Sequence, residues 1–180
     1  LPYETGTRLG ILMYGFNSSI PTPTGLRKIK RNILHKINHI SETILNNNLK
    51  VKPAYSLYTE VMSLRTINKG DFVGYGANYI AKESIIVATL PIGYADGMNN
   101  KMKYVSINNK KYPIIGDVCM DMTLVKVDPT IRIHDKVEIF GSSISIKSVS
   151  SLLGTNAYHI LTGITTRVPR VYSDNKEIKY

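Results

Sequence analysis

Residues 53–180 consist of short strand-like runs separated by turn-forming residues, and this pattern constrains the fold more than any other feature of the sequence. Apolar and polar residues alternate over 54–67, whereas residues 85–90 are suited to a fully buried strand. Strands of this length and spacing are typical of a β-barrel or sandwich, and no helical period alternates with them as a parallel sheet would require. The expected strands are 54–67, 79–82, 85–90, 104–107, 110–115, 122–127, 136–140 and 167–172, with a short helix at 145–153. We therefore expect a mainly β, barrel-like domain.

The first 48 residues have a different period. Residues 7–14 are mostly apolar and are followed by Gly15, which predicts a buried strand. Between residues 26 and 45, aliphatic side chains recur at steps of three or four, which predicts an amphipathic helix. These side chains are Leu26, Ile29, Ile33, Ile37, Ile40 and Ile44. The change of period predicts two parts, residues 1–48 and residues 49–180.

Charge and composition narrow the range of partners. The formal net charge is +10, and its excess is concentrated at residues 27–36, on the predicted helix. A basic patch can bind nucleic acid, but no zinc finger, RNP-type aromatic pair or GXXG loop accompanies it. We therefore expect a solvated helix face and no nucleic-acid partner, with a polyanion-binding patch as the alternative. No apolar run is long enough to span a bilayer, so we expect no membrane association.

Two glycine-containing clusters could carry chemistry. Arg8 lies on the first predicted strand with Gly10 and Ile11, and an arginine among apolar residues needs a buried partner or a ligand unless it marks an exposed strand end. Tyr75 lies between two glycines, Gly74 and Gly76. A tyrosine can act as an acid or base where a neighbouring cation lowers its pKa; otherwise it plugs an ordinary turn.

Two further clusters follow predicted strands. Tyr94 and Asp96 come directly after the buried strand 85–90, at a position where sites are commonly built. Cys119 has no nearby base or second cysteine, so we expect a buried structural cysteine. His35 and His39 have a spacing that could bind a metal, but surface positions are the simpler interpretation. We expect no metal site.

In combination, the motifs of this chain resemble a known family. They are R-x-G-I-x-x-Y-G, K-P-A, G-x-x-V-x-Y-G-x-x-Y, P-I-G-Y-A-D-G, I-x-G-x-x-C-M-D and R-V-P-R-V-Y, in that order. Their order resembles the carboxy-terminal half of alanine racemase, an isomerase that uses pyridoxal 5'-phosphate (PLP). The resemblance covers nearly the whole chain except the helix 26–46, which looks like an insertion.

The resemblance implies an architecture and an activity. Family members have an amino-terminal (β/α)8 barrel that binds PLP, followed by a carboxy-terminal β domain. They form homodimers whose active sites are shared between subunits. Residues 1–48 then correspond to the tail of the barrel and residues 49–180 to the β domain. The implied reaction interconverts L- and D-alanine for peptidoglycan synthesis in the bacterial cytoplasm.

The resemblance also implies roles for individual residues in cofactor binding. Arg8 looks like the arginine that faces the PLP pyridine nitrogen, and a guanidinium would leave that nitrogen unprotonated. Gly10 and Ile11 look like backbone contacts to the PLP phosphate. Tyr158 resembles the tyrosine that binds the same phosphate.

Further roles concern the substrate. Tyr75 resembles the catalytic base that the β domain contributes to the partner subunit's active site, opposite a lysine that acts on the other face of the substrate. Met120 resembles the residue whose backbone amide touches the substrate carboxylate, and Tyr94 resembles a tyrosine at the inner substrate entrance. The PLP lysine belongs to the family's amino-terminal half, and no motif here matches it. We therefore expect the isolated chain not to racemise.

Several departures from the family pattern leave alternatives open. Asp117 stands where the family often has an arginine, Met122 where it often has a glutamine, and His159 where a glutamate is common. These changes leave serine or another amino acid as an alternative substrate. A non-catalytic dimerisation or regulatory β domain is the alternative to an enzyme.

Overall fold

The computed structural model describes residues 53–173 and 178–179. Several predictions lie outside these residues: the strand at 7–14, the helix at 26–45, the boundary at residue 48, and the cofactor contacts Arg8, Gly10 and Ile11.

The described residues form antiparallel sheets. The largest has the order β1-β9-β6-β7 and the second has the order β2-β5-β8. Their strands are β1 (Leu57–Glu60), β9 (Lys136–Phe140), β6 (Tyr104–Ile107), β7 (Lys110–Pro113), β2 (Ser63–Ile67), β5 (Ile85–Leu90) and β8 (Thr123–Val127). Two short pairs complete the set: β3 (Phe72–Val73) with β4 (Tyr79–Ile80), and β10 (Tyr172–Ser173) with β11 (Ile178–Lys179). The mainly β fold is confirmed.

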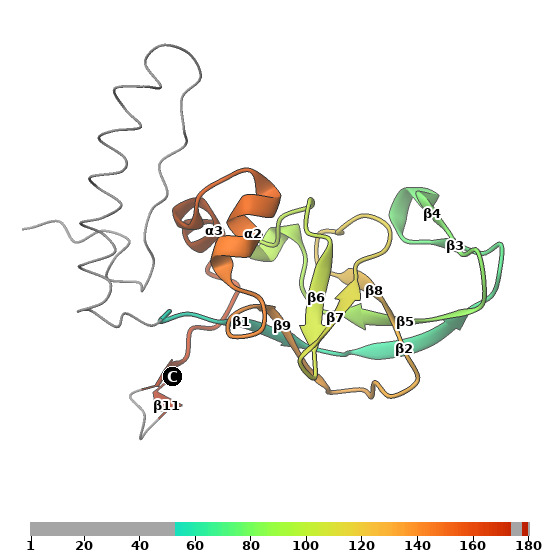
Figure 1. The fold of residues 1–180 in the computed structure, drawn as a ribbon, viewed down its shortest axis with the longest axis horizontal. Coiled ribbons are helices and arrows are strands. Elements are labelled where there is room, and N and C mark those ends of the chain that lie inside the picture. The colour runs from blue at the N-terminus through green and yellow to red at the C-terminus, as the bar shows by residue number, and fades with distance from the viewer. Residues whose placement is uncertain (1–52, 174–177, 180) are drawn as a thin grey trace, which may run out of the picture. The chain divides into compact units, whose positions relative to one another are not determined.

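Within residues 53–173, helical structure is confined to short elements. They are α2 (Ile146–Leu153), α3 (Ala157–Gly163) and the 3-10 turns η2 (Tyr75–Ala77) and η3 (Tyr94–Asp96). Figure 1 shows α2 and α3 packed beside each other at the end of the sheet that contains β1 and β9. Among the described residues, no helix is long and apolar enough to cross a membrane.

The strand predicted over 54–67 is in fact two strands that belong to different sheets. The chain bends at Val61 and Met62, where the Val61 amide donates to the Asp135 carbonyl and the Met62 amide donates to Thr89. The Val61 side chain is fully buried at this bend. The bend moves the chain from one sheet to the other. Among residues 53–173 the strands form separate sheets, connected by an isolated bridge between Ile114 and Val125, and they do not close into a barrel.

Other elements agree closely with the sequence. Strands β5, β6 and β9 have the predicted ends, and the predicted helix is confirmed as α2. The Ser145 side chain accepts a hydrogen bond from the Ser148 amide at the start of α2, and Gly154 ends the helix with a left-handed conformation (φ 65°). These are ordinary start and stop signals of a helix.

The predicted strand at 167–172 is wrong for all but its last residue. The Arg170 guanidinium donates to the carbonyls of Ile164, Thr165 and Val168, which keeps this segment in turns. Pro169, which lacks an amide hydrogen, interrupts the segment as well.

Helix α3 was not expected from the sequence. The sequence signal for its start is Asn156, whose side chain accepts a hydrogen bond from the His159 amide.

A small apolar cluster connects the β3–β4 pair to the β2-β5-β8 sheet. Val73 and Ala81 pack with Ile85, Val87, Ile115 and Leu124 from β5, β8 and the segment before β8. Burial of each such aliphatic side chain contributes about 1.5–3 kcal/mol. This cluster fixes the base of the hairpin that carries Tyr75.

Candidate active site

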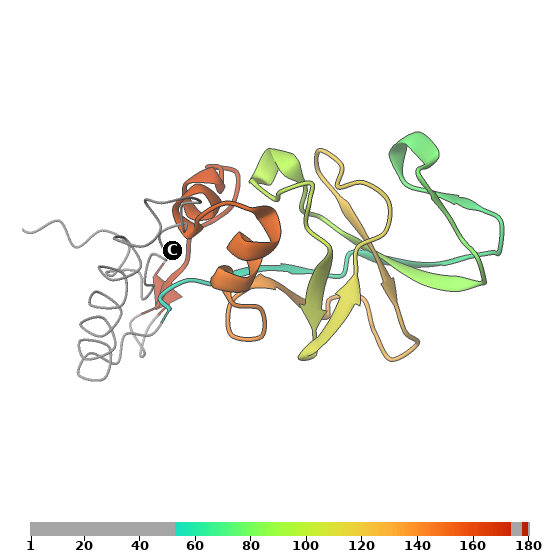
Figure 2. The same ribbon diagram turned by 45° about the horizontal axis from the view of Figure 1, so that its top comes forward.

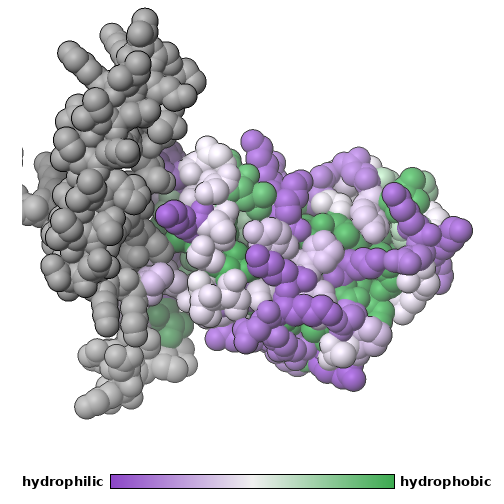
Figure 3. All heavy atoms as spheres, in the orientation of Figure 1, coloured by the Kyte–Doolittle hydropathy of each residue, from purple (hydrophilic) through white to green (hydrophobic). Residues whose placement is uncertain are grey.

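Tyr75 projects from the tip of the β3–β4 hairpin. Its side chain is 87% exposed, so it does not plug the turn. Gly74 (φ 83°, ψ 174°) and Gly76 (φ 79°) both have positive φ, which glycine adopts without a steric penalty. Figure 3 shows apolar side chains at the surface of this tip, where Phe72 and Ile80 are also exposed. The glycines thus present a phenol group on a narrow, projecting turn.

The hairpin tip contacts the loop 114–122. The Asn78 side-chain amide donates to the Asp117 carboxylate over 2.5 Å. A Cβ on Gly74 would lie 3.9 Å from the Gly116 Cα, so the two backbones pass close to each other. The Asp117 side chain therefore ties the loop to the segment that carries Tyr75.

A second contact connects the same loop to η3. The Tyr94 amide donates to the Cys119 carbonyl over 2.9 Å, and the Ala95 amide donates to the Met120 carbonyl over 3.0 Å. A Cβ on Gly93 would lie only 2.2 Å from the Met120 carbonyl oxygen, so a residue without a side chain is required there. The structure thus brings two predicted site residues, Tyr94 and Met120, together, each about half exposed.

The Met120 amide donates to no other described residue. The carbonyl of Cys119 belongs to the same peptide group and accepts from Tyr94. No described peptide bond is cis, and the carbonyl and amide of a trans peptide point in opposite directions. The Met120 amide therefore points away from the Tyr94 backbone, and no residue of the described chain accepts its hydrogen bond.

Figures 1 and 2 both show the loop 114–122 between η2 and η3, with all three on the same side of the strands. The three segments that carry Tyr75, Met120 and Tyr94 thus lie on one side of the described fold. Cys119, expected to be buried, is only partly so. In the part of the chain that the structure describes, no group of three His, Cys, Asp or Glu residues could hold a metal ion.

An arginine that the sequence analysis assigned to a strand connects η3 to this loop. The Arg167 guanidinium lies 3.4 Å from the Asp96 carboxylate and 2.6 Å from the Asp121 carboxylate. Asp121 and Asp96 raise the pKa of Arg167. The only sequence signal for this role of Arg167 was its position in the closing motif. Its two partners, Asp121 and Asp96, are 46 and 71 positions away in the sequence, and such distant ion pairs leave no local pattern.

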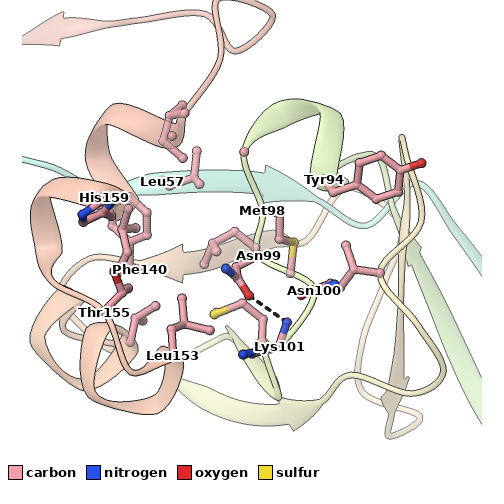
Figure 4. Close-up of a pocket in the computed structure, with 18 of the residues that line it drawn as sticks. Leu57, Tyr94, Met98, Asn99, Asn100, Lys101, Phe140, Leu153, Thr155 and His159 are labelled. Carbon is pink, nitrogen blue, oxygen red and sulfur yellow. Dashed lines mark hydrogen bonds between the residues drawn. The ribbon is translucent and has the colours of Figure 1, made fainter.

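Tyr158, the remaining described site residue, lies in the first turn of α3 and is partly exposed. A cavity of about 630 Å³ separates α2 and α3 from the loop after η3. Figure 4 shows Met98, Asn99 and Lys101 from that loop facing Leu153 and His159, with Tyr94 at the edge and its hydroxyl directed away. Of the four site residues that the structure describes, only Tyr94 lines this cavity, and the side chains of Tyr75, Met120 and Tyr158 are exposed elsewhere on the surface.

Comparison with known proteins identifies the family. Residues 54–172 match the family described as alanine racemase, C-terminal domain. The chain belongs to this family. The alanine racemase of Listeria innocua is 39% identical over 138 residues, which are 72% of this chain and 38% of the relative.

Solved structures agree with this assignment. The alanine racemase of Bacillus anthracis with bound L-Ala-P has a TM-score of 0.69 and 34% identity, over 72% of this chain and 35% of that one. The alanine racemase of Bartonella henselae with covalently bound pyridoxal phosphate has a TM-score of 0.66 and 29% identity, over 69% and 36%. The chain therefore spans well under half the length of the relatives it matches.

Proposed function

We propose that this chain is the carboxy-terminal part of a PLP-dependent alanine racemase that interconverts L- and D-alanine in the bacterial cytoplasm for peptidoglycan synthesis. In the homodimer, Tyr75 serves the active site of the partner subunit. The observation that carries the proposal is the projection of Tyr75, which is 87% exposed on a glycine-flanked tip. A base that acts within its own domain would be expected beside a pocket of that domain. A base that acts in the partner subunit's active site must instead project from the surface of its own subunit.

The fit of the cofactor to the described residues rests on Tyr158. Its phenol hydroxyl is a suitable donor to a phosphate, and its side chain is partly exposed. Tyr158, with Arg8, Gly10 and Ile11, would hold PLP, whose chemistry is to take up the electron pair released when the substrate Cα loses its proton. The relative from Bartonella henselae with covalently bound pyridoxal phosphate supports PLP as the cofactor.

The chain's own residues then have distinct roles toward the substrate. The Tyr75 hydroxyl moves a proton at Cα on one face, and racemisation needs a second group on the opposite face. The Met120 amide donates a hydrogen bond to the substrate carboxylate. Tyr94, held beside Met120 by two backbone hydrogen bonds, forms a wall of the entrance. No described residue accepts a hydrogen bond from the Met120 amide, and this supports its role as a donor to the substrate.

Alanine is the proposed substrate because the matched relatives are alanine racemases, and that of Bacillus anthracis holds L-Ala-P. Serine remains the alternative, and competition between L-serine and L-alanine in the full-length enzyme distinguishes them. We expect the isolated 180-residue chain with added PLP to produce no D-alanine, because the lysine that acts on the opposite face is assigned to the family's amino-terminal half.

The test of the catalytic role is Tyr75→Phe in the full-length enzyme. Loss of a positioned acid or base lowers the rate by about 10²–10⁴-fold, and we expect a fall of that order in kcat with little change in KM. The matched control is Tyr79→Phe, which removes a hydroxyl from the same hairpin, where Tyr79 packs on the apolar cluster. Unchanged racemisation in Tyr75→Phe would favour a non-catalytic β domain.

A further inference from the structure

We propose that Arg167 is a positioning residue: it clamps η3 to the segment Cys119–Asp121 and so fixes the Met120 amide relative to Tyr94. The clamp itself rests on the geometry of this chain. Its consequence for substrate binding rests on the proposed function.

The guanidinium joins two carboxylates that flank the site residues. One carboxylate belongs to Asp96, two residues after Tyr94, and the other to Asp121, one residue after Met120. The Asp96 side chain is largely buried, and its second oxygen accepts the Gly93 amide over 2.8 Å. Asp96 therefore transmits the position of Arg167 to the backbone at the start of η3.

The segment around Arg167 is itself braced against η3. The Thr165 amide donates to the Asp96 carbonyl over 3.2 Å, and the Thr165 hydroxyl donates to the Ala95 carbonyl over 2.9 Å. Close by, a Cβ on Gly97 would lie 2.2 Å from the Gly163 carbonyl oxygen. The turn η3 is thus held between the end of α3 with the Arg167 segment on one side and the loop with Met120 on the other.

The clamp has a purpose beyond stability. Arg167 is half exposed, and exposed ion pairs contribute little to folding. The residues 119–121 lie outside any strand, and two backbone hydrogen bonds connect them to η3. Arg167 also neutralises the charge of Asp121. Without Arg167, this negative charge would lie next to the Met120 amide and would repel the substrate carboxylate that the amide is proposed to bind. Both effects act on the placement and affinity of the substrate rather than on proton transfer.

The clamp is tested in the 180-residue chain by amide hydrogen exchange. In Arg167→Gln, the Tyr94 and Ala95 amides should exchange about three- to tenfold faster, the range expected for losing exposed charge-assisted bonds, with no change at Val105 and Ile107 in β6. The control Lys110→Gln removes an ion pair of similar length, to Asp128, and should leave Tyr94 and Ala95 unchanged. Unchanged exchange in Arg167→Gln, or faster exchange across the whole domain in both Arg167→Gln and the milder Arg167→Lys, would overturn the proposal.

The positioning role is tested by kinetics in the full-length enzyme. Arg167→Gln should raise KM for alanine about tenfold while kcat stays within about threefold, and Asp121→Asn added to it should lower KM again by removing the unpaired charge. A change in exchange without a change in KM would show a structural brace only and contradict the positioning role. If the wild-type enzyme does not racemise, the proposed function fails, while the exchange experiment still decides the clamp.

Discussion

The two regions that carry the site residues are built in opposite ways. Tyr75 stands on a projecting hairpin that is held by one strand pairing only two residues long and by a side-chain hydrogen bond from Asn78 to Asp117. Tyr94 and Met120 lie on segments joined backbone to backbone, with Gly93 allowing a close approach and Arg167 across them. The first design leaves a side chain free to reach another molecule, and the second fixes a surface against which a ligand can be oriented.

The largest effect should follow from Gly93→Ala. A Cβ there would lie 2.2 Å from the Met120 carbonyl oxygen, so η3 and the loop must separate. Overpacking of this kind costs about 1–3 kcal/mol or more, and we expect at least about 3 kcal/mol in urea unfolding of the chain because backbone atoms on both sides must move. The control Gly163→Ala meets no atom within 4 Å and should change stability little. Equal stability of the two variants would contradict the close backbone contact between η3 and the loop that carries Met120.

Gly74→Ala should have a smaller effect on stability. Its backbone (φ 83°, ψ 174°) lies in a region almost confined to glycine, but its Cβ would meet only ordinary contacts at 3.8 Å or more. Such strain costs about 1–3 kcal/mol, and a local rearrangement of the tip can relieve part of it. We expect a loss nearer about 1 kcal/mol by urea unfolding. A loss as large as that of Gly93→Ala would remove the contrast between the two regions.

The sequence predicted the strand framework better than the site for a physical reason. Strands β5, β6 and β9 are specified by local composition, so their ends could be predicted from neighbouring residues alone. The exposed Tyr75 tip could be located from Gly74 and Gly76, although its exposure could not. The Arg167–Asp96–Asp121 arrangement depends on long-range contacts, and Arg170 overrode the strand propensity of its segment by binding three carbonyls.

The smallest effect concerns how the stability of the strands depends on pH, and it arises from Asp128, which lies outside both site regions. Hydrogen bonds from Lys110, Thr130 and Tyr112 hold the pKa of Asp128 well below its usual range. A carboxyl with a lowered folded-state pKa contributes stability above its unfolded pKa of about 4, and this contribution is lost as the pH falls below that value. Asp128→Asn should therefore lower Tm slightly at pH 7 and weaken the dependence of Tm on pH below about 4. An unchanged dependence, measured by thermal unfolding between pH 2 and 7, would contradict this.

The central claim is that Tyr75 moves a proton on one face of the substrate Cα. The most direct measurement follows deuterium incorporation at Cα when the full-length Tyr75→Phe enzyme is incubated in D₂O with L-alanine or D-alanine separately. Because the opposite face keeps its own group, we predict that one enantiomer still exchanges its Cα hydrogen while the other does not. Exchange of both enantiomers at wild-type rates would contradict the claim.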